Sequence, residues 1–284
     1  MKVVVLGATG MLGNAVLRTM AESDAVDVVG TVRSEQSKAL FAPRLAERLE
    51  ILGDVMEYER VAEHLARLRP DVIINCISPD RRSLGKGDAL AIIPVCALLP
   101  HRLAAACADM GARLVHVSTD GVFSGRKGGY TEMDTCDATD VYGIAKHLGE
   151  VDAPHVVNLR TSMIGHELTG STGLLEWFLS QNGRCKCFRR AVFSGLPTVV
   201  LAQVVRDFVL PHPELSGVYH VASQAITKCE LLRLIARTYG KQIEILEDDG
   251  VAIDRSLDAG RFRAATGYAA PDWPALVRTM HALR

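Results

Sequence analysis

Two patterns of apolar and polar residues alternate along the first half of the chain. Short apolar runs rich in β-branched residues, at 2–6, 26–32, 71–77 and 113–119, are typical of strands buried on both faces. Between them, segments such as VAEHLARLR carry apolar residues at helical spacing. Regular alternation of strand and helix predicts right-handed crossovers and a parallel sheet covered by helices on both faces. The expected fold is therefore α/β and doubly wound.

The alternation becomes irregular in the second half. A loop and an amphipathic helix are expected within 165–183, and a later helix, CELLRLIARTYG, ends at Gly240. We interpret residues 1–160 as a sheet domain and 161–284 mainly as a smaller region. The strand-like GVYHVAS indicates that the chain returns to the first domain around 194–222.

The composition gives no indication of a nucleic-acid or membrane partner. Hydrophobic residues make up 48% of the chain and charged residues 23%, with a formal net charge of −1. This balance gives no overall attraction to nucleic acid or to an anionic membrane. There is no long apolar span and no signal-peptide pattern, so we expect no membrane partner and a cytoplasmic location. The seven cysteines form no CxxC pair, which predicts reduced thiols and no metal site.

A glycine-rich loop follows the first predicted strand directly. In GATGMLG, Gly7, Gly10 and Gly13 stand in GxxGxxG spacing between a buried strand and a helix. Glycines there let the backbone turn tightly and approach a pyrophosphate, whose charge lies at the helix N-terminus. The position predicts a dinucleotide site, and the alternative is a glycine-rich turn without a ligand.

The end of the second strand indicates which dinucleotide. An NAD site commonly has an acidic residue there, whereas this chain has Arg33 and Ser34. A guanidinium suits the 2′-phosphate of NADP, although a solvent-facing arginine is the alternative. Asp54 is placed to reach the adenine amino group or else to cap a turn. The NCIS stretch ends the third of these strands, where its backbone can pass close to the cofactor ribose.

A tyrosine and a lysine four positions apart are the candidate catalytic pair. Tyr142 and Lys146 lie on one face of a predicted helix, so the ammonium can lower the pKa of the phenol. A phenol tuned in this way can protonate an oxygen that is becoming an alkoxide. Ser118 and Thr119 end a predicted strand, at the sheet edge where ligands bind, and offer a hydroxyl to the same oxygen.

Four motifs together resemble those of extended short-chain dehydrogenase/reductases: GATGMLG, STDGVFSG, VYGIAKHLGE and LRTSMIG. Within that superfamily the chain is most similar to the dTDP-4-dehydrorhamnose reductase-like proteins. The similarity continues through FSGLPTV, GVYHVAS and RSLDAGRFRAATGY, and so covers nearly the whole chain. It implies a Rossmann-type domain that binds NADP, with NAD as the alternative, and a smaller C-terminal substrate-binding region.

The resemblance also implies roles for individual residues. Thr119, Tyr142 and Lys146 would be the catalytic hydroxyl, the proton donor and the tuning cation. Lys146 would also bind the nicotinamide ribose, with Thr161 and Ser162 near the nicotinamide. The expected cofactor-binding residues are Gly7, Thr9, Gly10, Met11, Leu12, Gly13, Arg33, Ser34, Asp54, Val55, Cys76, Ile77, Ser78, Tyr142, Lys146, Thr161 and Ser162.

This chain departs from the family pattern in two places. Cys96 stands where many members have an asparagine that holds a water for proton relay, and a thiol is a poor donor and acceptor. Gly121 stands where a larger side chain is expected, which would widen the substrate end of the site. Related 4,6-dehydratases carry Asp-Glu directly after the threonine, whereas only Asp120 is present here, so reduction fits better than elimination.

The expected function is NADPH-dependent reduction of the 4-keto group of a nucleotide-linked 6-deoxy sugar. The expected partners are a nucleotide-diphosphate sugar and, as an assembly, a homodimer. Arg160, Arg189 and Arg190 are candidates for the substrate diphosphate, with simple solvent exposure as the alternative. Two other functions stay open: a regulatory subunit resembling the methionine adenosyltransferase β-subunit, and an epimerase/reductase acting on a UDP-N-acetyl amino sugar.

Overall fold

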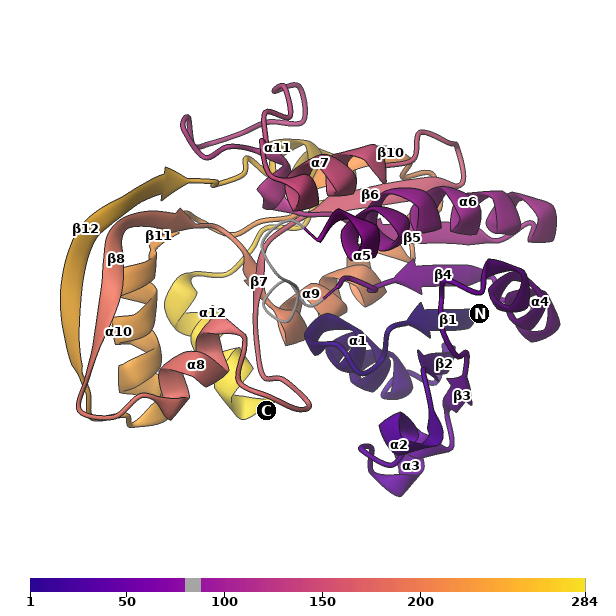
Figure 1. Ribbon diagram of the computed structural model, residues 1–284, viewed down its shortest axis with the longest axis horizontal. Helices are drawn as coiled ribbons and strands as arrows, with labels where there is room; N and C mark the ends of the chain where they lie inside the picture. Colours follow the sequence, from indigo (N-terminus) through magenta and orange to yellow (C-terminus); the bar gives the residue numbers. More distant parts are fainter. Residues whose placement is uncertain (80–87, 284) are drawn as a thin grey trace.

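A seven-stranded sheet forms the centre of the computed structural model, which describes residues 1–79 and 88–283 (Figure 1). Its strands run in the order β10-β6-β5-β4-β1-β2-β3, and every neighbouring pair is parallel. The predicted parallel sheet is therefore confirmed. The strands are β1 Lys2–Leu6, β2 Asp27–Val32, β3 Leu49–Ile51, β4 Val72–Asn75, β5 Arg113–Val117, β6 Val156–Arg160 and β10 Gly217–His220.

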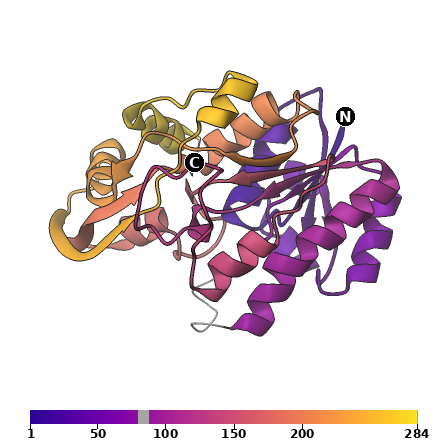
Figure 2. The same ribbon diagram turned by 90° about the horizontal axis from the view of Figure 1, so that it is seen from above.

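Helices cover both faces of this sheet, as the strand–helix alternation predicted (Figure 2). Helix α1 (Met11–Ala21) and α9 (Thr198–Val204), which continues as the π-helix η3 (Val205–Val209), pack on one face. Helix α4 (Tyr58–Leu68) and α6 (Leu99–Met110) pack on the other. Two short helices, α2 Glu35–Lys38 and α3 Pro43–Ala46, connect β2 to β3.

A continuous helical segment runs from Ala89 to Met110 and consists of α5 (Ala89–Ile93), the π-helix η1 (Pro94–Leu98) and α6. Proline has no backbone N–H, and the wider π-turn begins at Pro94, where an α-helical hydrogen bond is missing. By length and composition alone this is the one described helix that could cross a membrane. Half of its most apolar stretch, however, is buried within the protein.

A second, smaller sheet lies beside the first. Strand β8 (Arg184–Phe193) is at its centre, with β12 (Glu244–Asp254) parallel on one side and β11 (Ile226–Thr227) antiparallel on the other. The acidic, exposed β12 was not predicted, because its residues alternate poorly between apolar and polar. The remaining elements are η2 Asp120–Val122, α7 Val141–Leu148, β7 Met163–Ile164, α8 Leu174–Ser180, β9 Leu196–Pro197, α10 Lys228–Tyr239, α11 Gly260–Thr266 and α12 Trp273–Ala282.

One pair of cysteines differs from the prediction of reduced thiols. Cys187 on β8 and Cys229 at the start of α10 form a disulfide, and their Cα atoms are 5.2 Å apart. The two are 42 residues apart in the sequence, and only the packing of α10 on the small sheet brings them to bonding distance. The expectation is therefore wrong for this pair, while the other five cysteines are outside any disulfide.

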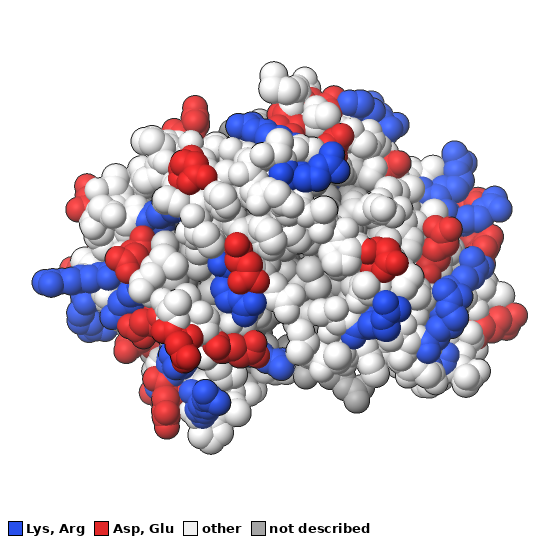
Figure 3. All heavy atoms as spheres, turned by 180° about the vertical axis from the view of Figure 1, so that it is seen from behind, with Lys and Arg blue, Asp and Glu red and all other residues white. Residues whose placement is uncertain are grey.

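The charged surface agrees with the near-neutral composition. Acidic and basic side chains are interspersed on the face shown in Figure 3, and a broad neutral area separates the groups. Several basic side chains of the protein pair with an acidic neighbour. Arg189, for example, donates to both carboxylate oxygens of Asp249. No single-sign field of the kind that attracts a polyelectrolyte is present on that face.

Candidate active site

Two adjoining cavities open at the carboxyl ends of the central strands, where ligands bind in open α/β sheets. The large cavity has a volume of about 610 Å³ and the small cavity about 340 Å³. They share the glycine loop, the segment after β4 and one distant residue, Thr169. The residues that line both are Thr9, Gly10, Cys76, Ile77, Ser78 and Thr169.

The glycine loop has the geometry that its spacing predicted. Gly7 has a φ of +83°, a conformation that L side chains rarely adopt. A Cβ on Gly13 would lie 2.1 Å from the Gly7 carbonyl oxygen, so only glycine allows this approach of helix and loop. Gly10 precedes α1 and provides no side chain to cap it, which leaves the helix N-terminus open toward the large cavity.

The predicted cofactor contacts after β2 and β3 divide into two groups. Arg33 lines the small cavity and is exposed, as a cation meant for a bound phosphate would be. Ser34 instead caps α2 by accepting a hydrogen bond from the Ser37 backbone N–H. Asp54 caps a turn through the Met56 backbone N–H at 3.0 Å, which is the alternative role anticipated for it. Neither Ser34 nor Asp54 is among the lining residues, and their contact with a cofactor stays a prediction.

Thr119, Tyr142 and Lys146 all line the large cavity. Thr119 follows β5 and accepts a hydrogen bond from the Gly121 backbone N–H at 3.0 Å. Helix α7, which carries the other two, is capped by Asp140, whose carboxylate accepts from the Gly143 N–H. A Cβ on Gly143 would lie 2.3 Å from the Gly121 carbonyl oxygen. The glycine in VYGIAK therefore allows α7 to approach the backbone of Gly121, two residues after Thr119.

Lys146 is the most deeply buried charged group of the site, with 2% of its surface exposed. Its Nζ donates to the Val117 carbonyl oxygen at 2.7 Å and lies 3.4 Å from His116 Nε2. Burial lowers the pKa of Lys146, opposed by the nearby Cys96, Glu150 and Cys76. A lysine in this state can change charge when its surroundings change.

Asp120 also lines the large cavity, next to Thr119. Thr119 Oγ1 donates to its carboxylate at 3.3 Å. Burial raises the pKa of Asp120 from 3.8 to about 6, against the opposing charge of Arg255. Gly121 is buried and is not itself among the lining residues. A Cβ there would lie 3.2 Å from Thr119 Oγ1.

Cys96 lies on η1, within an apolar cluster that packs against Tyr142. It is 1% exposed, and its carbonyl oxygen would lie 2.0 Å from a Cβ on Gly149, which fixes η1 against the end of α7. At the position where the family resemblance implies a water-holding asparagine, this chain thus has a buried thiol with the surroundings of a core residue.

Thr161 and Ser162 line the large cavity after β6, as expected. Other lining residues were not predicted, and five of them belong to the loop between β7 and α8. The GHELTGSTG sequence indicates a loop but gives no sign of where it lies. The lining residues that were not predicted as cofactor-binding or catalytic are Thr31, Val32, Ser37, Leu40, Leu52, Gly53, Pro79, Val117, Asp120, Met163, Glu167, Leu168, Thr169, Thr172 and Gly173.

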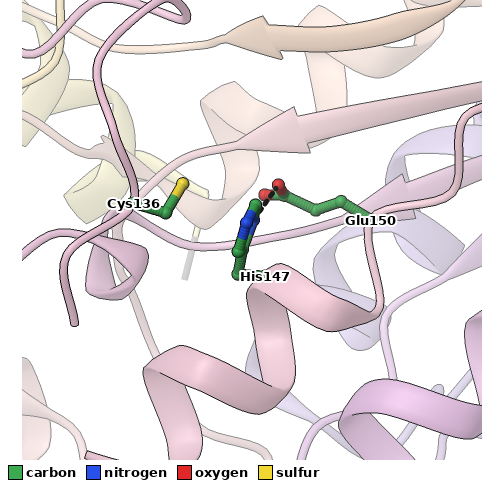
Figure 4. Close-up of side chains that lie close together, drawn as sticks. All are labelled: Cys136, His147 and Glu150. Atoms are coloured by element: carbon green, nitrogen blue, oxygen red, sulfur yellow. Dashed lines mark hydrogen bonds and ion pairs between the residues drawn. The ribbon is translucent and has the colours of Figure 1, made fainter. Parts of the chain in front are cut away.

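Cys136, His147 and Glu150 come close together near the end of α7 and could hold a metal ion by their spacing (Figure 4). Arg160 already occupies this cluster. Its guanidinium donates to both Glu150 oxygens at 2.7 Å and to Cys136 Sγ at 3.1 Å. An internal cation thus neutralises the carboxylate, and we assign no metal here. Arg160 is equally committed to Glu150, so it is not a free contact for a substrate diphosphate.

Comparisons with known proteins agree with the motifs. The model of a family described as the RmlD substrate binding domain matches residues 1–251. A probable low-salt glycan biosynthesis reductase of Haloferax volcanii is 29% identical, over 88% of this chain and 85% of its own. A dTDP-4-dehydrorhamnose reductase of Mycobacterium tuberculosis is 30% identical, over 61% of this chain and 52% of its own. The methionine adenosyltransferase 2 subunit beta of Danio rerio is 26% identical, over 84% and 74%.

The fold is also similar to that of solved structures. A dTDP-4-dehydrorhamnose reductase of Bacillus anthracis, solved in complex with NADP, superposes with a TM-score of 0.80 at 20% identity. The similarity covers 99% of both chains. The resemblance inferred from the four motifs is confirmed, and so is the enzyme class at the level of the family, since these relatives are named as reductases.

Proposed function

We propose, because this chain belongs to the RmlD substrate-binding-domain family, that it is an NADPH-dependent reductase of a nucleotide-linked sugar. The specific reaction we propose is reduction of the 4-keto group of a 6-deoxy sugar, carried out in the cytoplasm. The observation that carries the proposal is the meeting of Thr119, Tyr142 and Lys146 in one cavity next to the glycine loop. These three groups are the minimum set needed to polarise and protonate a carbonyl oxygen.

The residues present fit a dinucleotide. The open N-terminus of α1 and the close Gly7–Gly13 approach form the cradle for a pyrophosphate. Arg33 is the group we assign to the 2′-phosphate of NADP, with NAD as the weaker ligand. The bound nicotinamide would supply the hydride, and the chain's own residues provide everything else.

Each catalytic group has a distinct task in this proposal. Thr119 donates a hydrogen bond to the keto oxygen and orients it. Tyr142 protonates that oxygen as the alkoxide forms. Lys146 stands four residues further along α7 and favours the ionised phenol after proton transfer. Gly121 in place of a second acidic residue leaves no partner for Asp120 in an elimination, which supports simple reduction.

The test is loss of NADPH absorbance with a panel of dTDP- and UDP-linked 4-keto-6-deoxy sugars. Oxidation that depends on one sugar is expected, and Tyr142→Phe should lower turnover by at least roughly 100-fold, because a positioned proton donor contributes about that much. NADPH should still bind to this variant. Tyr58→Phe is the matched control, since Tyr58 donates to Arg102 O far from the cavities. Normal turnover in Tyr142→Phe would overturn the catalytic assignment.

A regulatory subunit is the second candidate. Two observations favour it: the match to the methionine adenosyltransferase subunit over 84% of this chain, and an apolar setting for Cys96 at the relay position. Such a protein would bind NADPH tightly, would not oxidise it with any sugar of the panel, and would co-purify with a larger enzyme. Sugar-dependent oxidation would exclude this reading.

A further inference from the structure

Asn75, His116 and Lys146 form a continuous chain of buried polar side chains beneath the two cavities. Asn75 on β4 and His116 on β5 are register partners, and each is 1% exposed. Asn75 Nδ2 lies 3.1 Å from His116 Nδ1, and His116 Nε2 lies 3.4 Å from Lys146 Nζ. At the other end, the Ile77 backbone N–H donates to Asn75 Oδ1 at 3.1 Å. The chain thus joins the floor of both cavities to the lysine.

The directions of these hydrogen bonds are linked. Because Ile77 N–H occupies Asn75 Oδ1, the amide nitrogen faces the ring and donates to His116 Nδ1. Burial, the largest cause, holds the pKa of His116 well below its usual range, so the ring is neutral. A neutral imidazole has one N–H, which must then be on Nε2 and point at Lys146. An amine can accept that hydrogen, whereas an ammonium cannot.

The opposite arrangement suits a charged lysine. The ammonium would donate to His116 Nε2, the ring proton would move to Nδ1, and Asn75 would turn its oxygen toward the ring. The Ile77 N–H would then lose its acceptor. Ile77 lines both cavities, so a bound ligand that offers an oxygen there would stabilise this second arrangement.

Other described groups also lie near Lys146, but none of those named here forms an ion pair with it. From β5 the Val117 carbonyl accepts one hydrogen bond, and η1 and the segment after β4 contribute Cys96 and Cys76. Burial raises the pKa of the Cys76 thiol to about 12, so this thiol is neutral. Glu150, beyond the end of α7, is bonded to Arg160. His116 is a titratable neighbour whose ring nitrogen approaches the lysine nitrogen directly, at 3.4 Å.

We propose that Asn75 and His116 are positioning residues that couple the protonation of Lys146 to the occupancy of the cleft at Cys76–Ser78. Binding of a dinucleotide there is accompanied by uptake of a proton from solvent onto Lys146. The charged lysine is then present when Tyr142 acts, and the free protein keeps an uncharged lysine in its core. The inference rests on the dinucleotide site of the proposed function.

The test is calorimetry of NADP⁺ binding in two buffers of different ionisation enthalpy, which gives the protons taken up per site. At about pH 8 the 2′-phosphate is already ionised and does not contribute. Wild type should take up protons, and Lys146→Met should not. Asn75→Asp accepts only, so it holds the ring proton on Nδ1 and favours the ammonium before binding. Uptake should fall by at least roughly half in Asn75→Asp and in His116→Leu.

Two variants separate this coupling from general damage to the core. His116→Gln keeps a group that can donate or accept and should retain uptake. His220→Leu removes another fully buried histidine, bonded to Tyr130 O, and should bind with wild-type uptake. Wild-type uptake in both Asn75→Asp and His116→Leu would overturn the proposal.

A second readout does not depend on the cofactor. In ¹³C NMR of lysine-labelled free protein, the Lys146 signal, identified by its loss in Lys146→Met, should titrate at higher pH in Asn75→Asp than in wild type. An unchanged titration would contradict the coupling even if NADP⁺ binds. Absence of NADP⁺ binding to wild type, with a shifted titration in Asn75→Asp, would instead contradict the dinucleotide site and leave the Asn75–His116–Lys146 chain standing.

Discussion

Two buried basic side chains, Arg160 and Lys146, are both influenced by the Glu150 carboxylate, and they have opposite environments. Arg160 on β6 meets Glu150 through two hydrogen bonds of 2.7 Å, and the side chains are 5% and 4% exposed. Burial alone would lower the pKa of Arg160, but Glu150 outweighs it and the pKa is raised. Lys146 is equally buried, meets a carbonyl and a ring, and has a lowered pKa.

The difference follows from the two side chains. A guanidinium matches a carboxylate with two parallel hydrogen bonds and stays charged, so it can form a permanent internal pair. An ammonium is a compact charge that gives up its proton when desolvated without a partner. The Arg160–Glu150 pair therefore stabilises the fold. Lys146 forms no ion pair within the described part of the chain, and we propose it for catalysis. Three substitutions test this contrast, beginning with the largest effect.

Glu150→Gln should lower the free energy of unfolding by about 3 kcal/mol, because it leaves the buried Arg160 without its counter-charge. Hydrogen bonds from Arg160 outweigh burial and lower the pKa of Glu150, so its stabilisation is complete above its unfolded pKa and is lost as pH falls. The gap between wild type and variant in urea unfolding should shrink in acid. Glu57→Gln, which breaks an exposed pair with Arg60, should cost under about 1 kcal/mol. Equal losses in the two variants would contradict the structural role.

Lys146→Met should show the reverse profile, with turnover reduced at least roughly 100-fold and stability nearly unchanged. Methionine fills a similar volume and removes a buried amine that has no ion pair with a carboxylate in the described part of the chain. Steady-state kinetics and urea unfolding measure the two effects. Lys241→Met is the matched control, since Lys241 also donates to a carbonyl, Leu179 O, but lies outside the cavities. A large stability loss in Lys146→Met would remove the distinction from Arg160.

Asp120→Asn tests a carboxyl group whose pKa is raised by burial, and has the smallest expected effect. The pKa of Asp120 is raised to about 6, so wild type is most stable while the carboxyl is protonated and loses stability as pH rises through that value. The variant should gain about 1–2 kcal/mol over wild type near pH 8 and nothing near pH 4. Asp137→Asn should behave oppositely, because hydrogen bonds from Ser124 lower the pKa of Asp137. A gain that is independent of pH would contradict this account of Asp120.

Local sequence patterns determined the doubly wound sheet, the glycine loop and the positions of Thr119, Tyr142 and Lys146. Each depends on short-range rules: apolar runs for buried strands, glycine where the backbone turns, and a four-residue spacing on one helical face. These rules did not predict strand β12 or the Cys187–Cys229 disulfide. Both depend on contacts between segments that are far apart in the sequence.

Only the tertiary structure decided the electrical character of the site. The sequence offered Arg160 as a free cation for a substrate, yet folding places Glu150 against it. His116 was one histidine among nine, until the pairing of β4 with β5 set it between Asn75 and Lys146. Burial and hydrogen-bond partners fix the charge of a side chain, and both arise from contacts between residues far apart in the chain.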